Sequence, residues 1–247
     1  MLKSTILVSL LALSAIAATQ TAVAQTAPDY AAIVAAPDRS EADKKLDTNR
    51  APAQWLMFIG AKPGMKILDI EAVYGWKAEL LARAVAPGGK VYAQNTEAAF
   101  ARVKDRLEAR LKTPAAVNIV SAVRPFEDPA PTGMHDFDLV TFFYGYHDVI
   151  NLGVDRAKMI KAFYDALKPG GELVVGDYSA KPGAGTSAAQ TLHRSDEALT
   201  RSEIEAAGFK SSDPGDFLRV PGDTREAHSH SAAEPVDIYA LKFRKPG

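Results

Sequence analysis

Short apolar runs alternate with segments of helical periodicity along most of this chain, and that alternation restricts its fold more than any other feature. Five runs have the length and apolar character of buried strands: residues 65–70, 91–93, 117–120, 137–143 and 173–175. Helical spacing separates several of them, at residues 77–85, 97–111 and 157–167. Strands joined through helices pair in parallel, so the pattern predicts one α/β domain, with a mostly parallel sheet covered on both faces.

The remaining segments are patterned more weakly. Residues 50–59 are predicted to form a short helix, and Thr200-Arg201-Ser202-Glu203 fits a capping box before a helix that ends near Gly208. Residues 217–220 and 238–243 are further strand candidates. Residues 182–190 are rich in Gly, Ala and Ser, which favours a mobile loop beside the strand ends.

The first 24 residues are typical of a targeting segment. Lys3 is followed by an apolar stretch at residues 5–18 and by Ala22-Val23-Ala24, which fits a small-x-small cleavage site. The alternative is an uncleaved anchor, but the apolar stretch is shorter than the roughly 20 residues that span a bilayer. We therefore expect a signal peptide at 1–24, a tether and helix at 25–49, and a single domain at 50–247. The protein is expected to be exported, periplasmic or secreted, without stable membrane insertion after cleavage.

Composition excludes several classes of function. The 29 Lys and Arg residues nearly balance the 30 Asp and Glu residues, so no strong field attracts nucleic acid. The chain contains no cysteine, which excludes disulfides, thiolate metal sites and a cysteine nucleophile. A small-molecule substrate is the partner expected, while the oligomeric state is left open.

In an open parallel sheet, ligands bind beyond the carboxyl ends of the strands, where the winding reverses. The loop after the first strand reads Asp69-Ile70-Glu71-Ala72-Val73-Tyr74-Gly75. This loop, the turns Ala86-Pro87-Gly88-Gly89 and Lys168-Pro169-Gly170-Gly171, and the strand Phe137-Asp138-Leu139-Val140 resemble class I S-adenosylmethionine-dependent methyltransferases. The chain looks most similar to predicted bacterial members that carry a signal peptide. The resemblance implies a Rossmann-like, doubly wound, seven-stranded sheet whose last strand is antiparallel.

The resemblance also implies S-adenosylmethionine as cofactor and assigns residues to it: Asp69, Glu71, Val73, Gly75, Asn95 and Phe126. Only Gly75 keeps a glycine of the family's loop. Glu71 can hold the ammonium of the methionine moiety or repel its carboxylate, and Val73 is poorly suited to a positive φ. Asn95 stands where a carboxylate usually binds the ribose, or else caps the next helix. Phe126 is an adenine wall or a core aromatic, and Asp69 contacts the cofactor or supports the loop.

Tyr146-His147-Asp148 follows the fourth strand and is the candidate for catalysis. His147 can act as a general base that Asp148 tunes, and the alternative is a loop histidine bonded to nearby backbone. His193 and Arg194 are candidates for an acceptor pocket in which Arg194 binds an anion, or for a solvated loop. His228 and His230 form a His-x-His pair without an evident third ligand, so no metal site is expected.

These observations favour methyl transfer from S-adenosylmethionine to a small molecule. The alternative is a non-catalytic exported binding domain that retained the fold, which the glycine-poor loop favours. A nicotinamide-dependent oxidoreductase needs Gly-x-Gly-x-x-Gly after the first strand, and an α/β-hydrolase needs Gly-x-Ser-x-Gly. The sequence contains neither at the required place.

Overall fold

The computed structural model describes residues 27–212, 214–232 and 234–247, so the predicted signal peptide at 1–24 lies outside it. The described residues form a seven-stranded sheet with the order β3-β2-β1-β4-β5-β7-β6. The strands are Lys66–Ile70 (β1), Lys90–Asn95 (β2), Ile119–Val123 (β3), Phe137–Phe143 (β4), Leu167–Tyr178 (β5), Lys210–Ser211 (β6) and Ile238–Arg244 (β7). The first five pair in parallel, whereas β7 is antiparallel to both of its neighbours. The predicted doubly wound α/β fold is confirmed.

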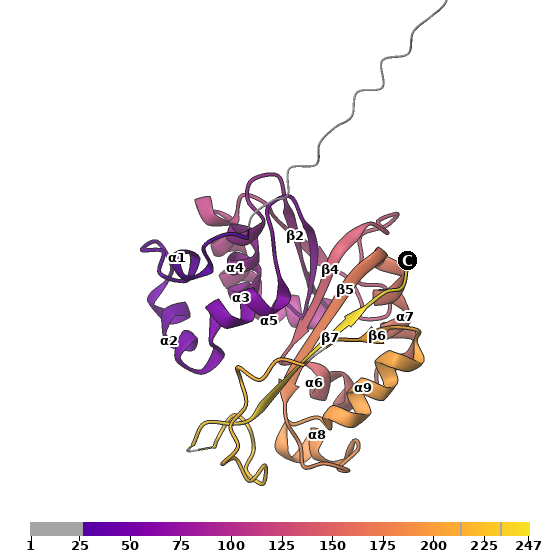
Figure 1. Ribbon diagram of the computed structural model, residues 1–247. Coiled ribbons are helices and arrows are strands. Elements are labelled where there is room, and N and C mark those ends of the chain that lie inside the picture. Colours follow the sequence, from indigo (N-terminus) through magenta and orange to yellow (C-terminus); the bar gives the residue numbers. More distant parts are fainter. Residues whose placement is uncertain (1–26, 213, 233) are drawn as a thin grey trace, which may run out of the picture.

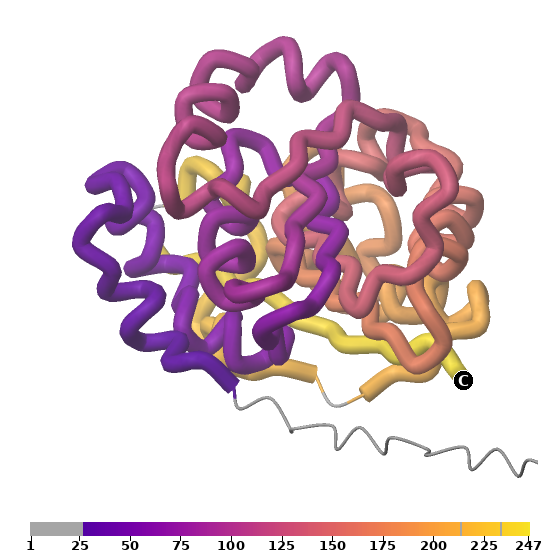
Figure 2. The backbone as a smooth tube through the Cα atoms, turned by 90° about the horizontal axis from the view of Figure 1, so that it is seen from above, coloured from indigo at the N-terminus to yellow at the C-terminus, as the bar shows by residue number. Residues whose placement is uncertain are grey.

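Helices flank the sheet on both sides (Figure 1). They are Tyr30–Val34 (α1), Glu41–Arg50 (α2), Pro52–Ile59 (α3), Trp76–Val85 (α4), Glu97–Leu111 (α5), Tyr146–Asn151 (α6), Arg156–Ala166 (α7), Ser187–Leu192 (α8) and Glu197–Ala206 (α9), with a 3-10 turn at Pro114–Ala116. The winding reverses between β1 and β4, because the chain moves outward from β1 through β2 and β3 and then returns to the other side of β1. In Figure 2 the early helices and the later ones lie on opposite sides of the molecule.

Side chains of alternate strand residues pack into two separate hydrophobic cores, one on each face of the sheet. In β1, Ile67 faces the core beneath α1, α3 and α4, while Leu68 and Ile70 face the core beneath α7 and α9. This follows from the period of two in a strand. Because both faces are covered, β1 reads as an apolar run rather than as an alternation.

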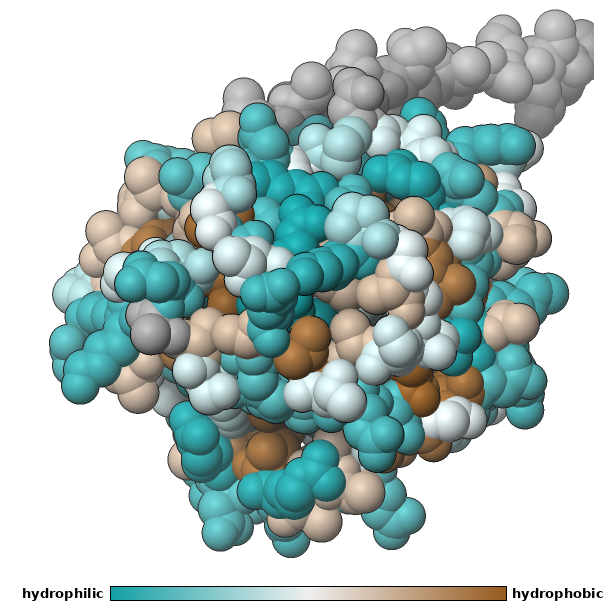
Figure 3. Space-filling model, turned by 90° about the horizontal axis from the view of Figure 1, so that it is seen from below, coloured by the Kyte–Doolittle hydropathy of each residue, from teal (hydrophilic) through white to brown (hydrophobic). Residues whose placement is uncertain are grey.

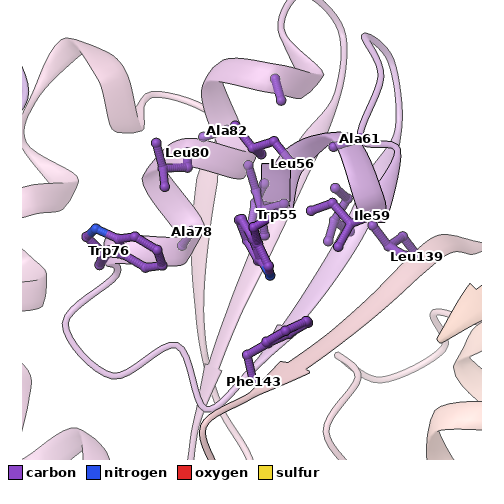
Figure 4. Packing of buried hydrophobic residues seen from close by; sticks show 14 of the residues in the cluster. Trp55, Leu56, Ile59, Ala61, Trp76, Ala78, Leu80, Ala82, Leu139 and Phe143 are labelled. Atoms are coloured by element: carbon purple, nitrogen blue, oxygen red, sulfur yellow. The ribbon is translucent and has the colours of Figure 1, made fainter. Parts of the chain in front are cut away.

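Trp55 organises the first core (Figure 4). Its ring lies edge-on to Phe143 at the end of β4, with centroids 5.7 Å apart, and tilted against Trp76 at 6.0 Å. Aromatic pairs in these geometries contribute about 0.5–1.5 kcal/mol beyond the area that they bury. The packing fixes the start of α4 relative to the end of β4, which are the two segments that border the strand ends.

The N-terminal residues expected to form a tether include a packed helix. Tyr30 in α1 is buried, and its hydroxyl donates to the carbonyl of Ala61 at 2.8 Å. Ser40 caps α2 by accepting from the N–H of Asp43 at 3.1 Å. The Ala-rich sequence around Tyr30 and Ser40 has little helical periodicity of apolar residues. The packing of these residues therefore could not be predicted from the sequence pattern.

Three local predictions are wrong. Residues 217–220 form no strand, and β6 at Lys210–Ser211 takes the outer position beside β7 instead. The last helix begins earlier than the capping box indicates, because Asp196 is its N-cap and accepts from the N–H groups of Ala198 and Leu199. The segment 182–190 is not loop throughout, since α8 begins at Ser187.

The carboxyl ends of the parallel strands meet at one edge, the lower one in Figure 1, where α6 and α8 also lie. Seen from that side, the surface is mainly hydrophilic with small hydrophobic patches (Figure 3). Among the described residues, no helix is both long and apolar enough to cross a membrane.

Candidate functional site

The loop between β1 and α4 takes left-handed backbone at alternate residues although only one of them is glycine. The φ angles are +51° at Glu71, +53° at Val73 and +87° at Gly75. A left-handed conformation costs a residue with a side chain about 1–2 kcal/mol. The loop therefore has positive φ at the three positions where the resemblance places glycines, including Val73, for which such a backbone was not expected.

Residues at the end of β2 hold this backbone in place. The amide of Asn95 accepts from the N–H of Val73 at 2.9 Å and donates to the carbonyl of the same residue at 3.1 Å. The side chain of Gln94 accepts from the N–H of Glu71 at 3.0 Å. Asn95 thus uses both ends of its amide on the loop. These contacts favour a supporting role for Asn95 over the ribose contact or the helix cap proposed from sequence.

Gly75 is required by helix packing. A Cβ at this position would lie 2.9 Å from Cδ of Arg110 and 3.3 Å from a methyl of Leu107, both in α5. The preceding Tyr74 stacks beneath Arg106 of the same helix, 3.9 Å from guanidinium carbon to ring centroid. Val73, in contrast, is 36% exposed. The loop is therefore pinned to α5 at one end and open to solvent in its middle.

Beneath the loop lies a buried ion pair. Nζ of Lys77 donates to the carbonyls of Ile70, Glu71 and Phe143 at 3.1–3.3 Å and lies 3.6 Å from Asp69. Asp69 is fully buried and also accepts from the hydroxyl of Thr141 at 2.8 Å. Burial raises the pKa of Asp69, against the opposing effect of the Lys77 charge. Asp69 and Lys77 thus join the ends of β1 and β4, and these contacts favour the supporting role for Asp69.

Glu71 turns its carboxyl group toward the loop that follows β4. Its Oε2 lies so close to Gly145 that a Cβ added to that glycine would be 2.0 Å from Oε2. Oε2 has no hydrogen-bond partner among the described residues. Burial, followed by the negative charge of Asp148, raises the pKa of Glu71 to about 7. A buried acceptor without a donor is expensive unless a ligand supplies one. The ammonium and sulfonium groups of S-adenosylmethionine are cationic, so this loop fits that cofactor.

His147 is held by a carboxylate that the sequence analysis did not single out. Asp177, at the end of β5, lies 2.9 Å from Nδ1 of His147 and accepts from its backbone N–H at 2.7 Å. Asp177 also accepts from Ser195 at 2.7 Å. Burial lowers the pKa of His147, but the neighbouring Asp177 outweighs it and the net shift is upward. With Nδ1–H bonded to Asp177, neutral His147 presents a lone pair on Nε2.

The three residues 146–148 point in different directions. Oδ1 of Asp148 lies 3.5 Å from Nε2 of His147, and the ring of His193 lies 5.1 Å from that of His147. Tyr146 instead extends into the second core, where its hydroxyl bonds to Glu203. The structure therefore brings His147, Asp148 and His193 together and places Tyr146 away from them.

Two further predicted residues are buried in structural contacts. Arg194 is fully buried, pairs with Asp223 at 2.7 Å and donates to the carbonyls of Ser179 and Ala227. Its guanidinium is thus unavailable to a substrate in this conformation. Phe126 packs against Phe142, with ring centroids 6.1 Å apart, inside the second core. The contacts favour a core aromatic over an adenine wall.

A pocket of about 740 Å³ opens beside this cluster. Tyr144 and Tyr178 at the strand ends line it, together with Arg50 from α2 and His230 from the loop before β7. The guanidinium of Arg50 lies 4.8 Å from the ring of Tyr144. The volume is typical of small-molecule sites.

Sequence reasoning missed Lys77 and Asp177. Both lie at strand ends or in the first turn of the following helix, which are the positions that border the ligand edge of a parallel sheet. The sequence analysis considered the ends of the first four strands; the same rule applied to the fifth strand points to Asp177 in Gly-Asp-Tyr. No sequence signal indicates that His228 and His230 fold back beside His147 and His193.

The ubiE/COQ5 methyltransferase family profile matches residues 52–194 of this chain. A ubiquinone/menaquinone biosynthesis C-methyltransferase from Shewanella sp. strain W3-18-1 is 28% identical over 120 residues, which cover 49% of this chain and 45% of that protein. The corresponding protein of Cupriavidus taiwanensis is 31% identical over 131 residues, covering 51% and 49%. The chain thus spans about half the length of these curated relatives.

Solved structures share the fold at low identity. An S-adenosylmethionine-dependent methyltransferase from Aquifex aeolicus superposes with a TM-score of 0.59 at 16% identity, covering 82% of this chain and 96% of that one. A sarcosine dimethylglycine methyltransferase homologue from Galdieria sulphuraria gives 0.60 at 18%, covering 84% and 91%. Because the family profile covers more than half of the residues, including the loop at Glu71 and the histidine at 147, this chain belongs to the ubiE/COQ5 methyltransferase family.

Proposed function

We propose that this protein transfers the methyl group of S-adenosylmethionine to a small-molecule acceptor. The observation that carries the proposal is the unpartnered carboxyl group of Glu71. It lies in a loop with left-handed backbone, at the point where the winding of the sheet reverses. The cofactor supplies a methyl group bound to a positively charged sulfur. A nucleophile attacks the methyl carbon in line with the carbon–sulfur bond, and the sulfur leaves as a neutral thioether.

The loop residues provide the cofactor side. Glu71 accepts a hydrogen bond from the ammonium of the methionine moiety, which supplies the donor that its Oε2 lacks. Asn95 and Gln94 fix the backbone of the loop so that little ordering is needed on binding. Lys77 keeps the ends of β1 and β4 together, which sets the distance between the loop and His147.

His147 and the adjoining pocket provide the acceptor side. The Nε2 lone pair of His147 accepts the proton of an acceptor hydroxyl or amine, while Asp177 orients the ring and stabilises the imidazolium that forms. Tyr144 and Tyr178 line the pocket with aromatic rings. The curated relatives are named for C-methylation in ubiquinone and menaquinone biosynthesis. We propose a small acceptor with an apolar ring, sized to the 740 Å³ pocket.

Calorimetric titration with S-adenosylmethionine at pH 8, where Glu71 is ionised, tests the cofactor side. We expect one site per chain, and a Glu71→Gln variant that binds at least tenfold more weakly, since a hydrogen bond to a charged group contributes about 1.5–3 kcal/mol. Glu108→Gln, on the solvent-exposed face of α5, is the matched control and should bind like the wild type.

Absence of binding at millimolar ligand would overturn the proposal and leave the non-catalytic binding domain. A second pair of variants sharpens that outcome. If Glu71→Gly and Val73→Gly together create binding that the natural chain lacks, the glycine-poor loop has lost its cofactor. If they weaken a binding that the natural chain already has, Glu71 holds the ligand and does not obstruct the site.

We also propose that the protein is exported. The support is the n-region, apolar stretch and Ala22-Val23-Ala24 of the sequence, and a structural relative from Bordetella parapertussis described as a possible exported protein (TM-score 0.53, 17% identity). Expression in a Gram-negative host followed by N-terminal sequencing of the periplasmic fraction tests it. A mature chain that begins at Gln25 is expected, whereas an intact N-terminus in the cytoplasm contradicts export.

A further inference from the structure

Four of the five histidines of the chain gather at one place, although they lie far apart in the sequence. His147 is in α6, His193 ends α8, and His228 and His230 belong to the loop before β7. The ring of His193 is 5.1 Å from that of His147, 5.2 Å from that of His230 and 4.4 Å from that of His228. The described residues leave only His135 outside the cluster.

The nitrogen atoms in the middle of this cluster lack partners. Nε2 of His147 and Nδ1 of His193 are both buried, and neither has a hydrogen-bond partner among the described residues. His147 itself is 1% exposed, so water does not replace the missing partner easily. His193 takes a left-handed φ of +48° at the end of α8, a conformation that non-glycine residues adopt at a cost in free energy. Two buried nitrogens without partners, one of them on a residue with left-handed backbone, are typical of a site that a ligand completes.

Asp148 adds a carboxylate to the two imidazoles. One ligating atom from each of His147, Asp148 and His193 lies within 4.8 Å of the others, and Oδ1 of Asp148 is 3.5 Å from Nε2 of His147. In a tetrahedral site with bonds of about 2.0–2.2 Å, ligand atoms stand roughly 3.4 Å apart and imidazole rings roughly 5 Å apart. The spacings of His147, Asp148 and His193 approach these values. A side-chain shift of about an ångström would bring the ligating atoms to the tetrahedral spacing.

The surroundings of His147 are those of a metal ligand. Asp177 accepts the Nδ1 proton of His147, which fixes the tautomer with its lone pair on Nε2. Asp177 is itself oriented by the hydroxyl of Ser195, which bonds to the hydroxyl of Tyr239 at 2.6 Å. A carboxylate behind a histidine, held by further hydrogen bonds, is the usual outer shell of a metal-bound imidazole.

We propose that His147, Asp148 and His193 bind one divalent transition-metal ion of the zinc class, with His230, from the loop before β7, as a further ligand. Two imidazoles and one carboxylate suit Zn²⁺ and its neighbours, whereas Mg²⁺ prefers oxygen ligands alone. His228 is less suited, because its Nδ1 accepts from the N–H of His230 at 3.2 Å. The His230 ring also lines the 740 Å³ pocket, so the proposed metal site adjoins the space proposed for the acceptor.

This proposal does not depend on the proposed methyl transfer, because the ion binds to the protein alone. If both hold, the ion occupies the Nε2 lone pair of His147, so it would acidify a coordinated acceptor hydroxyl and the proton would pass to solvent water rather than to the ring.

Zinc titration of metal-stripped protein, purified without a histidine tag, tests the proposal in competition with a chromophoric chelator. We expect one Zn²⁺ per chain and no displacement by equimolar Mg²⁺. His193→Ala should weaken zinc binding at least tenfold. Asp177→Asn, which leaves all ligands in place, should weaken it about 10–100-fold. His135→Ala is the matched control and should bind zinc like the wild type.

Replacement by Co²⁺ gives a readout of the ligand set, since a tetrahedral or five-coordinate site with nitrogen ligands has visible ligand-field bands that His193→Ala should alter. Circular dichroism establishes that each variant is folded. Should Asp177→Asn fail to fold, His193→Ala and His230→Ala still decide the matter, because both residues are partly solvent-exposed at loop positions. Substoichiometric zinc, or equal affinities for His193→Ala and His135→Ala, overturns the proposal.

Discussion

Lys77→Met removes the buried cation that joins the ends of β1 and β4 while keeping an unbranched side chain of similar length. In the wild type, Nζ of Lys77 donates to three backbone carbonyls and lies 3.6 Å from Asp69. Asp69 has no exposed surface, and one of its oxygens has no hydrogen-bond partner among the described residues. The variant therefore leaves a buried carboxylate without its counter-charge.

The magnitude follows from these contacts. Removing one partner of a buried ion pair costs about 3–5 kcal/mol, which includes the loss of hydrogen bonds to the charged group. A domain of this kind has a total stability of about 5–15 kcal/mol, so the variant should fold but with a much lower free energy of unfolding. Asp69→Asn combined with Lys77→Met removes both charges and should recover at least about 1 kcal/mol of the loss.

Urea unfolding at pH 7, followed by tryptophan fluorescence, measures the difference. Lys104→Met is the control, because this lysine is exposed on α5 and its pairing with Glu108 spans 3.9 Å. Exposed pairs of this kind contribute less than about 1 kcal/mol. A loss below about 1 kcal/mol for Lys77→Met, or a double variant less stable than the single one, would refute the assignment of Lys77 as the counter-charge of Asp69.

Three further predictions follow from single contacts. The pKa of Glu71 rises from 4.5 to about 7 on folding, so ionisation of Glu71 destabilises the folded state. The stability of Glu71→Gln relative to the wild type should therefore increase as the pH rises from 4.5 through 7. Urea unfolding should show a gain of up to about 3 kcal/mol. Gly145→Ala places a methyl 2.0 Å from the Glu71 carboxyl and 2.7 Å from the Phe142 ring, so cofactor affinity measured by calorimetry should fall at least tenfold. Arg194→Met leaves Asp223 without its buried partner and should lower the free energy of unfolding by about 3–5 kcal/mol, whereas an anion-binding role alone would leave it unchanged.

The alternation of strand and helix predicted a mostly parallel α/β sheet, whereas the seven strands and the antiparallel last strand came from the family resemblance. The predicted bounds of β4 and α5 agree with the structure to the residue, because a fully buried strand and an amphipathic helix each have a strong period. The errors fall where tertiary contacts override local signals. Thr200 lies inside α9 rather than at its start, because Asp196 caps the helix, and the Thr200 hydroxyl instead hydrogen-bonds the buried Tyr239.

The site was predictable only in part. Position after a strand identified Glu71 and His147, since the carboxyl edge of a parallel sheet collects such residues. The orientation of side chains was not predictable, as neighbours along the chain show: His193 faces the histidine cluster while Arg194 turns inward to Asp223. The meeting of His147 with His230 depends on how a long loop folds back, which has no period in the sequence.

A crystal structure with S-adenosylhomocysteine, the demethylated product, tests the central claim most directly. The account predicts that the amino group of the ligand lies within hydrogen-bonding distance of Oε2 of Glu71 and that its sulfur faces the segment from Gly145 to His147. A ligand bound with its amino group away from Glu71, or a loop at residues 71–75 that refolds to admit it, would contradict the account.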